Sequence, residues 1–525
     1  MDKEGIRIPK FYLLRALPLV LGAGIISFIL LTSPQPSYAD PLCGNNITEP
    51  GEACDGDDQN GYTCSSVAAG FSGGILSCKA DCSGYDVSSC DRGSTIEAQS
   101  CAQGDVQVAI GQAQDGDTVL VPAGQCSWNG TLDLDPMPAI VLKGAGVDQT
   151  VITDRTPAGG WGNSLIWIES VEGKPFRITG FTFTDQGAAD PNGVINIQGN
   201  VKNWRVDHNK FEDIHQRAVR TSGFNYGIID HCTLNIPGDG TVQGILVESD
   251  DSGSWERPLS LGTADAVYVE DSIFNYEYDN DGVLDAGDGG RFVFRHNTVA
   301  NTGIGQHGRD SGGGRSTHSF EIYENTFTTD TRIWTVMNFR GGTGVVFNNE
   351  MSGPYSNFSF VSNYCSCYGH TPGYCVFDQC LQYPCIDQIG RSSDMDGDGV
   401  QELEPLYEWN NTLNGSDVDT EMNPNFTGCC DPEHIQEGRD YYNDLARLDY
   451  VPYVYPHPLV QMDLPSPSAD LNEDGRVDVL DVQLCTNVAL GVETDPEIVN
   501  KADINLDGVV DTLDVLKIIQ GILGK

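Results

Sequence analysis

Residues 176–183 read FRITGFTF, and altered copies of this phrase return along the middle of the chain. Two apolar residues alternate along a strand, a polar corner follows, and one large apolar residue closes the phrase. The closing residues lie 28, 23, 40, 25, 28 and 24 positions apart and are Phe183, Phe211, Leu234, Phe274, Val299, Phe327 and Met351. A repeat of this size cannot bury its own apolar face and must stack on its neighbours. Because propeller blades need about 40 residues, the spacing favours a parallel β-helix.

The polar corner carries a recurring position two residues before each closing residue. The side chains there are Asn209, Cys232, Ser272, Asn297, Asn325 and Asn349. Stacked asparagine side chains can hydrogen-bond along a stack of strands, so we predict a ladder inside the β-helix. The charged residues within the phrase, such as Arg295, His208, His231 and His296, are interpreted as structural.

The composition indicates several domains and a strongly acidic protein. The chain has 525 residues, more than one ordinary core accommodates. It carries 29 basic and 75 acidic residues, for a formal net charge of −46. Such a field repels nucleic acid and anionic membrane surfaces, so no nucleic-acid partner is predicted.

The first 39 residues are interpreted as a signal peptide. A basic start precedes the apolar run 17–31, and Ser37-Tyr38-Ala39 has the small residues of a cleavage site. A single membrane anchor is the alternative. No second apolar run of about 20 residues follows, so the mature chain is predicted to span no membrane. We therefore expect a secreted protein, extracellular or attached to a cell surface, whose 17 cysteines mainly form disulfides.

Residues 40–92 form a predicted cysteine-rich module. Six cysteines lie between positions 43 and 90, which allows three bridges in a segment too short for a large core. The text CGNNITEPGEACDG resembles short cysteine-rich modules of bacterial secreted proteins. We expect a spacer or attachment module.

Residues 95–353 are assigned to the β-helix. Near its start a helix with Val106 and Ile110 on one face leads to the buried strand 118–121, and would cover the open end of the stack. Cys101 and Cys126 bracket this cap and are predicted to pair. The phrase CAQGDVQVAIGQAQDGDTVLVPAGQCSW, with IVLKGAGVDQTVI after it, resembles pectate-lyase-like proteins. The resemblance spans about residues 100–460 and implies an all-β, right-handed parallel β-helix of the pectin lyase type.

Residues 354–462 are read as a cysteine-rich insertion followed by the end of the β-helix domain. Five cysteines crowd between positions 365 and 385, and the pair Cys429-Cys430 follows. Zinc binding is the alternative, but disulfides are favoured in an exported chain. The stretch YVPYVYPHPL (450–459) resembles the end of secreted β-helix enzymes that degrade polysaccharides. Residues 463–469, with Pro-Ser-Pro-Ser, serve as a stiff linker.

Residues 470–525 contain a duplicated calcium loop, DLNEDGRVDVLD and DINLDGVVDTLD. Each loop places oxygen ligands at positions 1, 3, 5, 9 and 12, a backbone carbonyl at position 7, and glycine at the sharp turn of position 6. The predicted ligands are Asp470, Asn472, Asp474, Arg476, Asp478 and Asp481, then Asp503, Asn505, Asp507, Val509, Asp511 and Asp514.

Aspartate at position 12, with no helix before the loop, resembles a type I dockerin rather than a full EF-hand. The resemblance implies bound Ca²⁺ and a cohesin module as partner. A calcium-stabilised structural tail is the alternative. Positions 10 and 11 of the loops, Val479-Leu480 and Thr512-Leu513, are more apolar than is usual in dockerins.

A third acidic run, DMDGDGVQELEP (394–405), has carboxylates at positions 1, 3 and 5 and glycine at position 6, but lacks an acid at position 12. Asp394, Asp396 and Asp398 are therefore candidate ligands of a lone calcium loop.

A groove is expected along one outer face of the β-helix, because side chains on that face line up about 4.8 Å apart per coil. The segments just before each phrase should form it: 194–199, 218–223, 244–249, 283–289 and 335–340. Of the 29 basic residues, 12 lie between 201 and 340, which argues for an anionic polysaccharide. The candidate substrate-binding residues are Arg217, Arg315, Arg340 and Asn196.

The leading hypothesis is a polysaccharide lyase acting on a uronic-acid polymer by β-elimination. Elimination needs a cation beside the substrate carboxylate, a base, and an acid for the leaving oxygen. Arg220 and Arg309 are candidates for neutralisation or proton abstraction, with His215 or His307 as alternative bases. Glu248, Asp285 and Asp288 are candidate ligands of a bridging calcium. The alternatives are a glycoside hydrolase that uses these carboxylates and a non-catalytic adhesin or glycan-binding β-helix.

Overall fold

The computed structural model describes most of the chain beyond the predicted signal peptide. The described residues are 43–157, 164–185, 192–237, 243–278, 282–308, 314–362, 384–423, 435–462, 471–472, 477–502, 504 and 509–523. The predicted signal peptide, and the cysteines between positions 365 and 380 and at 429 and 430, lie outside them.

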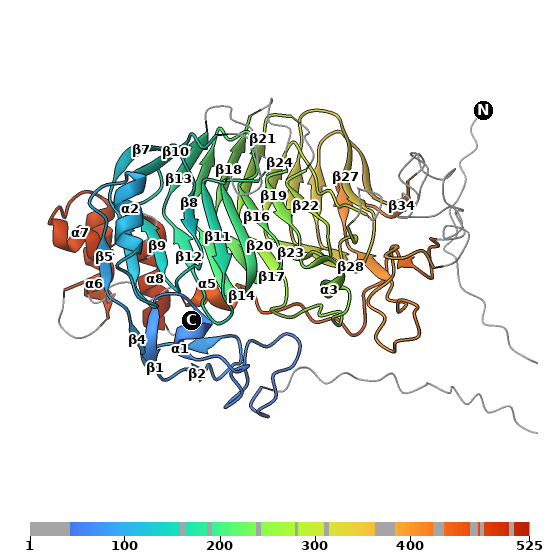
Figure 1. Ribbon diagram of the computed structural model, residues 1–525, viewed down its shortest axis with the longest axis horizontal. Helices are drawn as coiled ribbons and strands as arrows, with labels where there is room; N and C mark the ends of the chain where they lie inside the picture. The colour runs from blue at the N-terminus through green and yellow to red at the C-terminus, as the bar shows by residue number, and fades with distance from the viewer. Residues whose placement is uncertain are drawn as a thin grey trace, which may run out of the picture. The chain divides into compact units, whose positions relative to one another are not determined.

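The central part of the chain is a parallel β-helix, as predicted. Each coil passes through three sheets in turn, and the strands of successive coils lie side by side (Figure 1). Sheet 1 contains β8 (Leu132–Leu134), β11 (Ile166–Ser170), the first half of β14 (Ile195–Asp207), β16 (Val219–Thr221), β19 (Ile245–Val247), β22 (Leu284–Ala286), β27 (Ile333–Phe339), β30 (Tyr355–Val361) and β34 (Thr420–Met422).

Sheet 2 holds the strands that open each repeated phrase. It contains β5 (Thr95–Glu97), β6 (Thr118–Val121), β9 (Val141–Gly144), β12 (Arg177–Thr179), the second half of β14, β17 (Phe224–Asp230), β20 (Val267–Glu270), β23 (Arg291–Arg295), β25 (Ser319–Tyr323), β28 (Thr343–Phe347), β31 (Leu406–Trp409) and β35 (Tyr441–Tyr442).

Sheet 3 holds the strands that close each phrase. It contains β7 (Gly124–Trp128), β10 (Thr150–Asp154), β13 (Thr182–Asp185), β15 (Lys210–Glu212), β18 (Thr233–Ile236), β21 (Ile273–Tyr276), β24 (Thr298–Ala300), β26 (Thr326–Thr328), β29 (Glu350–Ser352) and β32 (Thr412–Leu413), with β33 (Ser416–Asp417) antiparallel at its end. The closing residues of the phrase, from Phe183 to Met351, are all buried in one core.

The predicted helix caps the first coil. It is α2 (Gln103–Ile110), and its Val106, Ala109 and Ile110 are buried in the β-helix core. The predicted disulfide between Cys101 and Cys126 is present. It ties the start of the cap to β7, so the open end of the stack is covered by residues close in sequence.

The predicted ladder runs through the corner between sheets 2 and 3. The Oδ1 of Asn325 accepts the backbone N–H of Asn297 at 2.9 Å, and its Nδ2 donates to Asn349 Oδ1 at 2.9 Å. Asn349 in turn donates to Asn411 Oδ1 at 2.8 Å. The sequence analysis missed Asn411, because the 62 residues between these two rungs hide the repeat.

Replacing Asn325 with alanine is expected to lower the free energy of unfolding by about 3 kcal/mol, because it leaves the buried N–H of Asn297 and the carbonyl of Phe294 without partners. Denaturant unfolding measures the change. Asn275→Ala is the matched control: its exposed amide donates to Asn235, and the expected loss is under about 0.5 kcal/mol. Equal losses in the two variants would contradict the role of the ladder.

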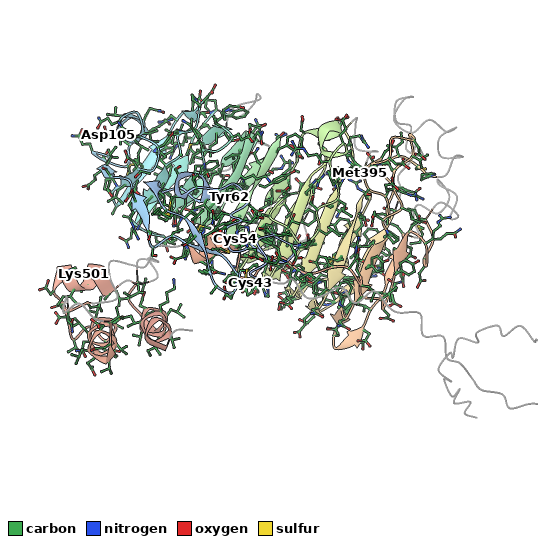
Figure 2. All side chains as sticks on the ribbon, turned by 90° about the horizontal axis from the view of Figure 1, so that it is seen from below. Cys43, Cys54, Tyr62, Asp105, Met395 and Lys501 are labelled. Atoms are coloured by element: carbon green, nitrogen blue, oxygen red, sulfur yellow. A yellow bond between two sulfur atoms is a disulfide. The ribbon has the colours of Figure 1, made fainter. Side chains whose placement is uncertain are left out.

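The cysteine-rich module contains α1 (Cys64–Val67), β1 (Phe71–Gly74), β2 (Ser77–Cys78), β3 (Tyr85–Asp86) and β4 (Cys90–Arg92). Its six cysteines form three bridges, the number predicted, and the structure pairs Cys43 with Cys82, Cys54 with Cys78 and Cys64 with Cys90. Cys54 and Tyr62, which are labelled in Figure 2, share an apolar cluster with Ile228 and Tyr268 of sheet 2. The module therefore packs on the outer face of sheet 2.

The segment 450–462, called here the strap, also lies against sheet 2 and ends in α5 (Pro458–Gln461). Arg295 on β23 holds it: the guanidinium donates to the carbonyls of Tyr453 and Val454 at 2.7 and 2.8 Å. Its Nε lies 2.6 Å from the Glu270 carboxylate, and both side chains are 0% exposed. These contacts with the strap and with Glu270 account for the structural role predicted for Arg295.

The C-terminal segment is helical, with α6 (Val479–Ala489), α7 (Pro496–Ala502) and α8 (Thr512–Leu523). Leu471, Cys485, Val488, Ala502, Ile504 and Ile518 form its own small core. None of the described helices is both long and apolar enough to cross a membrane.

Candidate functional site

The predicted groove face is the outer face of sheet 1. Strand pairing aligns Trp167, Asn196, Arg220, Leu246 and Asp285 in one row across five coils. Their strand neighbours Ile195, Ile245 and Leu284 point into the core and are fully buried, so the row itself faces outward. The alternation of side chains along each strand positions the polar residues of the row.

A cleft of about 190 Å³ opens on this face and gathers six of the predicted residues. It is lined by Arg217, Leu246, Glu248, Asp285, Gly287, Asp288, His307, Gly308, Gly314 and Arg315. These residues come from turns and strands of four coils, so stacking brings together groups that lie almost 100 positions apart. The cleft is the candidate functional site.

His307 and Asp285 form a pair inside the cleft. His307 Nδ1 lies 2.6 Å from Asp285 Oδ2, and the side chains are 39% and 2% exposed. This short contact is not aligned as a hydrogen bond. Among the described residues, neither carboxylate oxygen of Asp285 accepts a hydrogen bond. Such contacts often tighten only when substrate binds. A carboxylate beside Nδ1 leaves Nε2 as the ring nitrogen of this imidazole that could accept a proton from a substrate.

Glu248 and Asn192 are among the described partners of Arg220. Its Nε and Nη2 lie 2.9 and 2.7 Å from Glu248 Oε2, and Nη1 donates to Asn192 Oδ1 at 3.3 Å. The ion pair fixes the guanidinium and offsets part of its charge. Arg217, one turn earlier, donates from Nη2 to the neutral amide of Gln243 at 2.8 Å.

Asp288 is the most perturbed acid of the cleft. Burial, together with the nearby charges of Glu248 and Asp251, raises its pKa to about 6. The chain at Gly314 passes so close that a β-carbon there would lie 1.6 Å from Asp288 Oδ1. The carboxyl group is thereby confined to the cleft. Because its pKa is about 6, a good fraction of the carboxyl groups is protonated in mildly acidic solution.

Arg315 lines the cleft but has a structural partner. Its Nε and Nη2 donate to Asp387 at 2.7 and 2.6 Å, and the guanidinium lies over the Trp255 ring. The sequence analysis missed Asp387, which lies 72 residues away in the insertion. No local pattern marks such a partner, so Arg315 cannot be identified as structural from sequence.

The other predicted groove residues do not line the described cleft. His215 is on the corner between sheets 3 and 1, where Nδ1 pairs with Asp185 at 2.8 Å. Asn196 lies on the outward row but is 1% exposed and donates to the carbonyl of Asn192. Arg340 donates to the carbonyl of Gln306. Arg309 lies outside the described residues.

The predicted groove calcium lacks a common ligand set in the described structure. The carboxylates of Glu248, Asp285 and Asp288 are not among the groups of three acidic, histidine or cysteine side chains whose ligand atoms all lie within 4.8 Å of one another. Arg220 and His307 pair with two of them instead. Calcium at these three carboxylates remains a prediction.

Asp394, Asp396 and Asp398 do gather within 4.8 Å. Asp394 accepts the backbone N–H of Gly397 and of Gly399, both at 2.8 Å, so the loop turns as its glycines predict. Calcium at this loop remains a prediction.

The described parts of the C-terminal loops fit calcium loops. Asp481 is fully buried at the start of α6 and accepts the backbone N–H groups of Leu471, Asn472 and Asp478. Asp514 is likewise fully buried and accepts the N–H of Asp511. Val509 is exposed and offers only its carbonyl. The remaining predicted ligands, Asp470, Asp474, Arg476, Asp503, Asn505 and Asp507, lie outside the described residues.

Comparisons with known proteins gave a match to one family model and a match to a solved structure. Residues 468–523 match the family model of the dockerin type I domain, a calcium-binding domain, as predicted. A search of the curated proteins gave no match to the chain. Among solved structures, an alginate lyase from Paenibacillus sp. str. FPU-7 aligns at 14% identity with a TM-score of 0.29, over 51% of this chain and 97% of that chain. The likeness to pectate-lyase-like proteins remains a prediction.

Proposed function

We propose that this chain is a secreted, carbohydrate-active protein whose β-helix cleaves a uronic-acid polymer by β-elimination, and whose dockerin attaches it to a cohesin module. The observation that carries the proposal is the cleft on sheet 1. It gathers an accessible histidine, paired with the buried Asp285, with Arg217 and a carboxyl group of raised pKa, and Glu248 in its lining pairs with Arg220.

The elimination needs a proton to leave the carbon next to the substrate carboxylate. Arg217, with Arg220 beside it, would neutralise that carboxylate and make the proton more acidic. His307 Nε2 would take the proton, while Asp285 stabilises the imidazolium that forms. The electron pair of the broken C–H bond becomes the new C=C bond, and the bond to the glycosidic oxygen breaks.

Asp288 is the candidate acid for the leaving oxygen. A carboxyl group with a pKa near 6 is both protonated in mildly acidic solution and acidic enough to give its proton up. Its burial and its acidic neighbours produce that value. The proton gained by His307 and the proton lost by Asp288 balance over one cleavage, and solvent resets both groups.

Activity is expected to fall as pH rises above about 6, by up to tenfold per pH unit, because Asp288 must be protonated and its pKa is about 6. The pH profile of kcat/KM measures this limb. Asp251→Asn removes a negative charge that raises the pKa of Asp288, so the limb should move to lower pH. A limb that stays in place in both Asp251→Asn and Asp288→Asn would exclude Asp288 as the acid.

Glycoside hydrolysis is the second candidate, because Glu248 and Asp288 resemble the acid and base pair of that reaction. One carboxyl group has a raised pKa, and the other is ion-paired to Arg220. A hydrolase would protonate the leaving oxygen from Asp288 and use Glu248 as base or nucleophile. Here His307 would only orient groups, so its removal should cost much less than in a lyase.

The dockerin supports attachment to another protein. At the starts of α6 and α8, Val479, Leu480 and Leu513 are 71, 57 and 54% exposed. Exposed apolar side chains in a group mark interaction surfaces. A cohesin with an apolar matching face is the expected partner.

The deciding experiment is mass spectrometry of the products formed from pectin, alginate and glycosaminoglycans by the full chain. A lyase gives fragments with one unsaturated end. Fragments that have gained water instead would favour the hydrolase. Polymers that remain intact but are retained by the protein would favour a glycan-binding β-helix and overturn the enzymatic proposal.

A further inference from the structure

Two histidines occupy the same position of two successive coils, at the corner between sheets 2 and 3. His208 follows Asp207 at the end of β14, and His231 follows Asp230 at the end of β17. Strand pairing aligns Asp207 with Asp230, and the backbone N–H of His208 donates to the carbonyl of Asp230 at 3.2 Å. The two imidazole rings are therefore stacked, with their centroids 4.9 Å apart and an angle of 5° between their planes.

Each of these aspartates is an ionised carboxylate buried behind its histidine. Asp207 accepts two hydrogen bonds from Arg177, at 2.7 and 2.6 Å, and Asp230 accepts two from Arg205, both at 2.8 Å. Both aspartates are fully buried. Although burial opposes ionisation, the arginine charges hold the pKa of Asp207 well below its usual range and also lower the pKa of Asp230. Because an ionised carboxylate has no proton to donate, both aspartates can only accept hydrogen bonds.

The two carboxylates leave the outer nitrogen of each ring as a donor of an electron pair. His208 Nδ1 lies 2.7 Å from Asp207, and His231 Nδ1 lies 2.8 Å from Asp230. Nδ1 therefore carries the proton of each neutral ring, and the lone pair is on Nε2. Among the described residues neither Nε2 has a hydrogen-bond partner, and the side chains of His208 and His231 are 20 and 40% exposed. Histidines that bind metals commonly have this arrangement, in which the other ring nitrogen donates to a carboxylate.

The surroundings favour a cation at this corner. The two arginines balance the charges of the two buried aspartates, so the pairs do not oppose the attraction of cations by a chain of net charge −46. Asp271 has the same corner position one coil further on, because Asp230 pairs with Glu270. Although burial lowers the pKa of His231, Asp230 and Asp271 raise it overall, so their charges stabilise a cation at this ring. Asp271 acts through its charge, since its carboxylate and the two imidazoles do not form a group whose ligand atoms all lie within 4.8 Å of one another.

We propose that Nε2 of His208 and Nε2 of His231 together bind one divalent transition-metal ion, Cu²⁺ or Zn²⁺, with water in its remaining positions. Imidazole nitrogen suits these ions, and Cu²⁺ binds such a site most tightly. At metal–nitrogen distances of about 2.0–2.1 Å the two nitrogens lie no more than about 4 Å apart, so the outer edges of the rings converge by roughly 1 Å on binding. Ca²⁺ takes oxygen ligands and is not expected there. The site is separate from the cleft on sheet 1 and does not require that the cleft cleaves anything.

The test is isothermal titration of the full, untagged chain with Cu²⁺ and with Zn²⁺, in an excess of Ca²⁺ that occupies the oxygen-rich loops. Electron paramagnetic resonance of the Cu²⁺ form shows whether ligand nitrogen is coupled to the metal. His208→Gln and His231→Gln each remove one ligand. His296→Gln is the matched control, because His296 has the same corner position one coil beyond Asp271 and is 21% exposed, but its Nε2 lies 3.1 Å from Glu324.

We expect the wild type and His296→Gln to bind Cu²⁺ with nitrogen coupling, and His208→Gln and His231→Gln each to bind it roughly tenfold or more weakly. Unfolding temperatures within about 2 °C of the wild type would show that the variants are folded. A second measurement needs no variant: in the wild type, Zn²⁺ should protect His208 and His231, but not His296, from modification by diethyl pyrocarbonate, as located by mass spectrometry. Equal affinity in all four proteins, or modification of His208 and His231 that Zn²⁺ does not slow, would overturn the proposal.

Discussion

His307→Ala is expected to lower kcat about a thousandfold, with a much smaller change in KM. The imidazole lines the cleft and pairs through Nδ1 with the buried Asp285, and removal of a general base typically costs 10²–10⁴-fold in rate. Asp285→Asn should also lower kcat strongly, because the imidazole remains but the carboxylate that would favour its reactive tautomer is gone. Initial rates of unsaturated-product formation measure both variants.

His231→Ala is the matched control for this prediction. His231 is 40% exposed, close to the 39% of His307, and it also pairs with a buried aspartate, Asp230, at 2.8 Å. It lies on the corner between sheets 2 and 3, away from the residues that line the cleft. Its kcat should stay within about twofold of the wild type. If His307→Ala keeps more than a tenth of the activity, another residue is the base.

Arg295→Met is expected to have the largest effect on stability, a loss of about 3–5 kcal/mol in the free energy of unfolding. Removing one partner of a buried ion pair leaves the other charge uncompensated. Here Glu270 would lose its cation, and the strap carbonyls of Tyr453 and Val454 would lose their donors. Denaturant unfolding of the full chain, followed by β-sheet circular dichroism, measures the loss.

The pH dependence of this loss has a definite sign. Burial already raises the pKa of Glu270 when Arg295 is present, and without the arginine it should rise further. A carboxyl group whose pKa is raised on folding favours the folded state at low pH and loses that contribution as pH rises through the folded-state value. The deficit of Arg295→Met should therefore shrink in acid and grow towards neutral pH.

Two further variants isolate the ion pair. Arg295→Met/Glu270→Leu removes the uncompensated carboxylate and should recover a part of the loss. Arg332→Met replaces an exposed arginine that donates only to Ser356 among the described residues, and should change stability by less than about 0.5 kcal/mol. A loss in Arg295→Met no larger than in Arg332→Met would contradict the role given to the strap.

The fold was largely predictable because its determinants are local and repeat. Alternating apolar residues define each strand, and a spacing of 23 to 28 residues between most closing positions defines the coil. The ladder from Asn297 to Asn349, the cap over 103–110 and the pairing of Cys101 with Cys126 follow from the same short patterns. The ligands of a calcium loop also lie within 12 residues, so the dockerin was visible in the sequence.

The outer face of sheet 1 was predictable for the same reason. The interaction partners of the side chains on that face were not. Strand alternation determines that Arg220 and Asp285 point outward. It does not determine that Glu248 holds Arg220, or that His307 rather than His215 reaches the cleft. These outcomes depend on the lengths and paths of the turns between coils.

The sequence by itself determined a stacked β-helix between a disulfide-rich module and a dockerin, because strand period, coil spacing and ligand spacing are all short-range. Only the tertiary structure decided which charges meet. Asp387 reaches Arg315 across 72 residues, and the strap reaches Arg295 across about 158. Such partners are brought together by the stacking of whole coils and by segments that return over them, and no local pattern records that path.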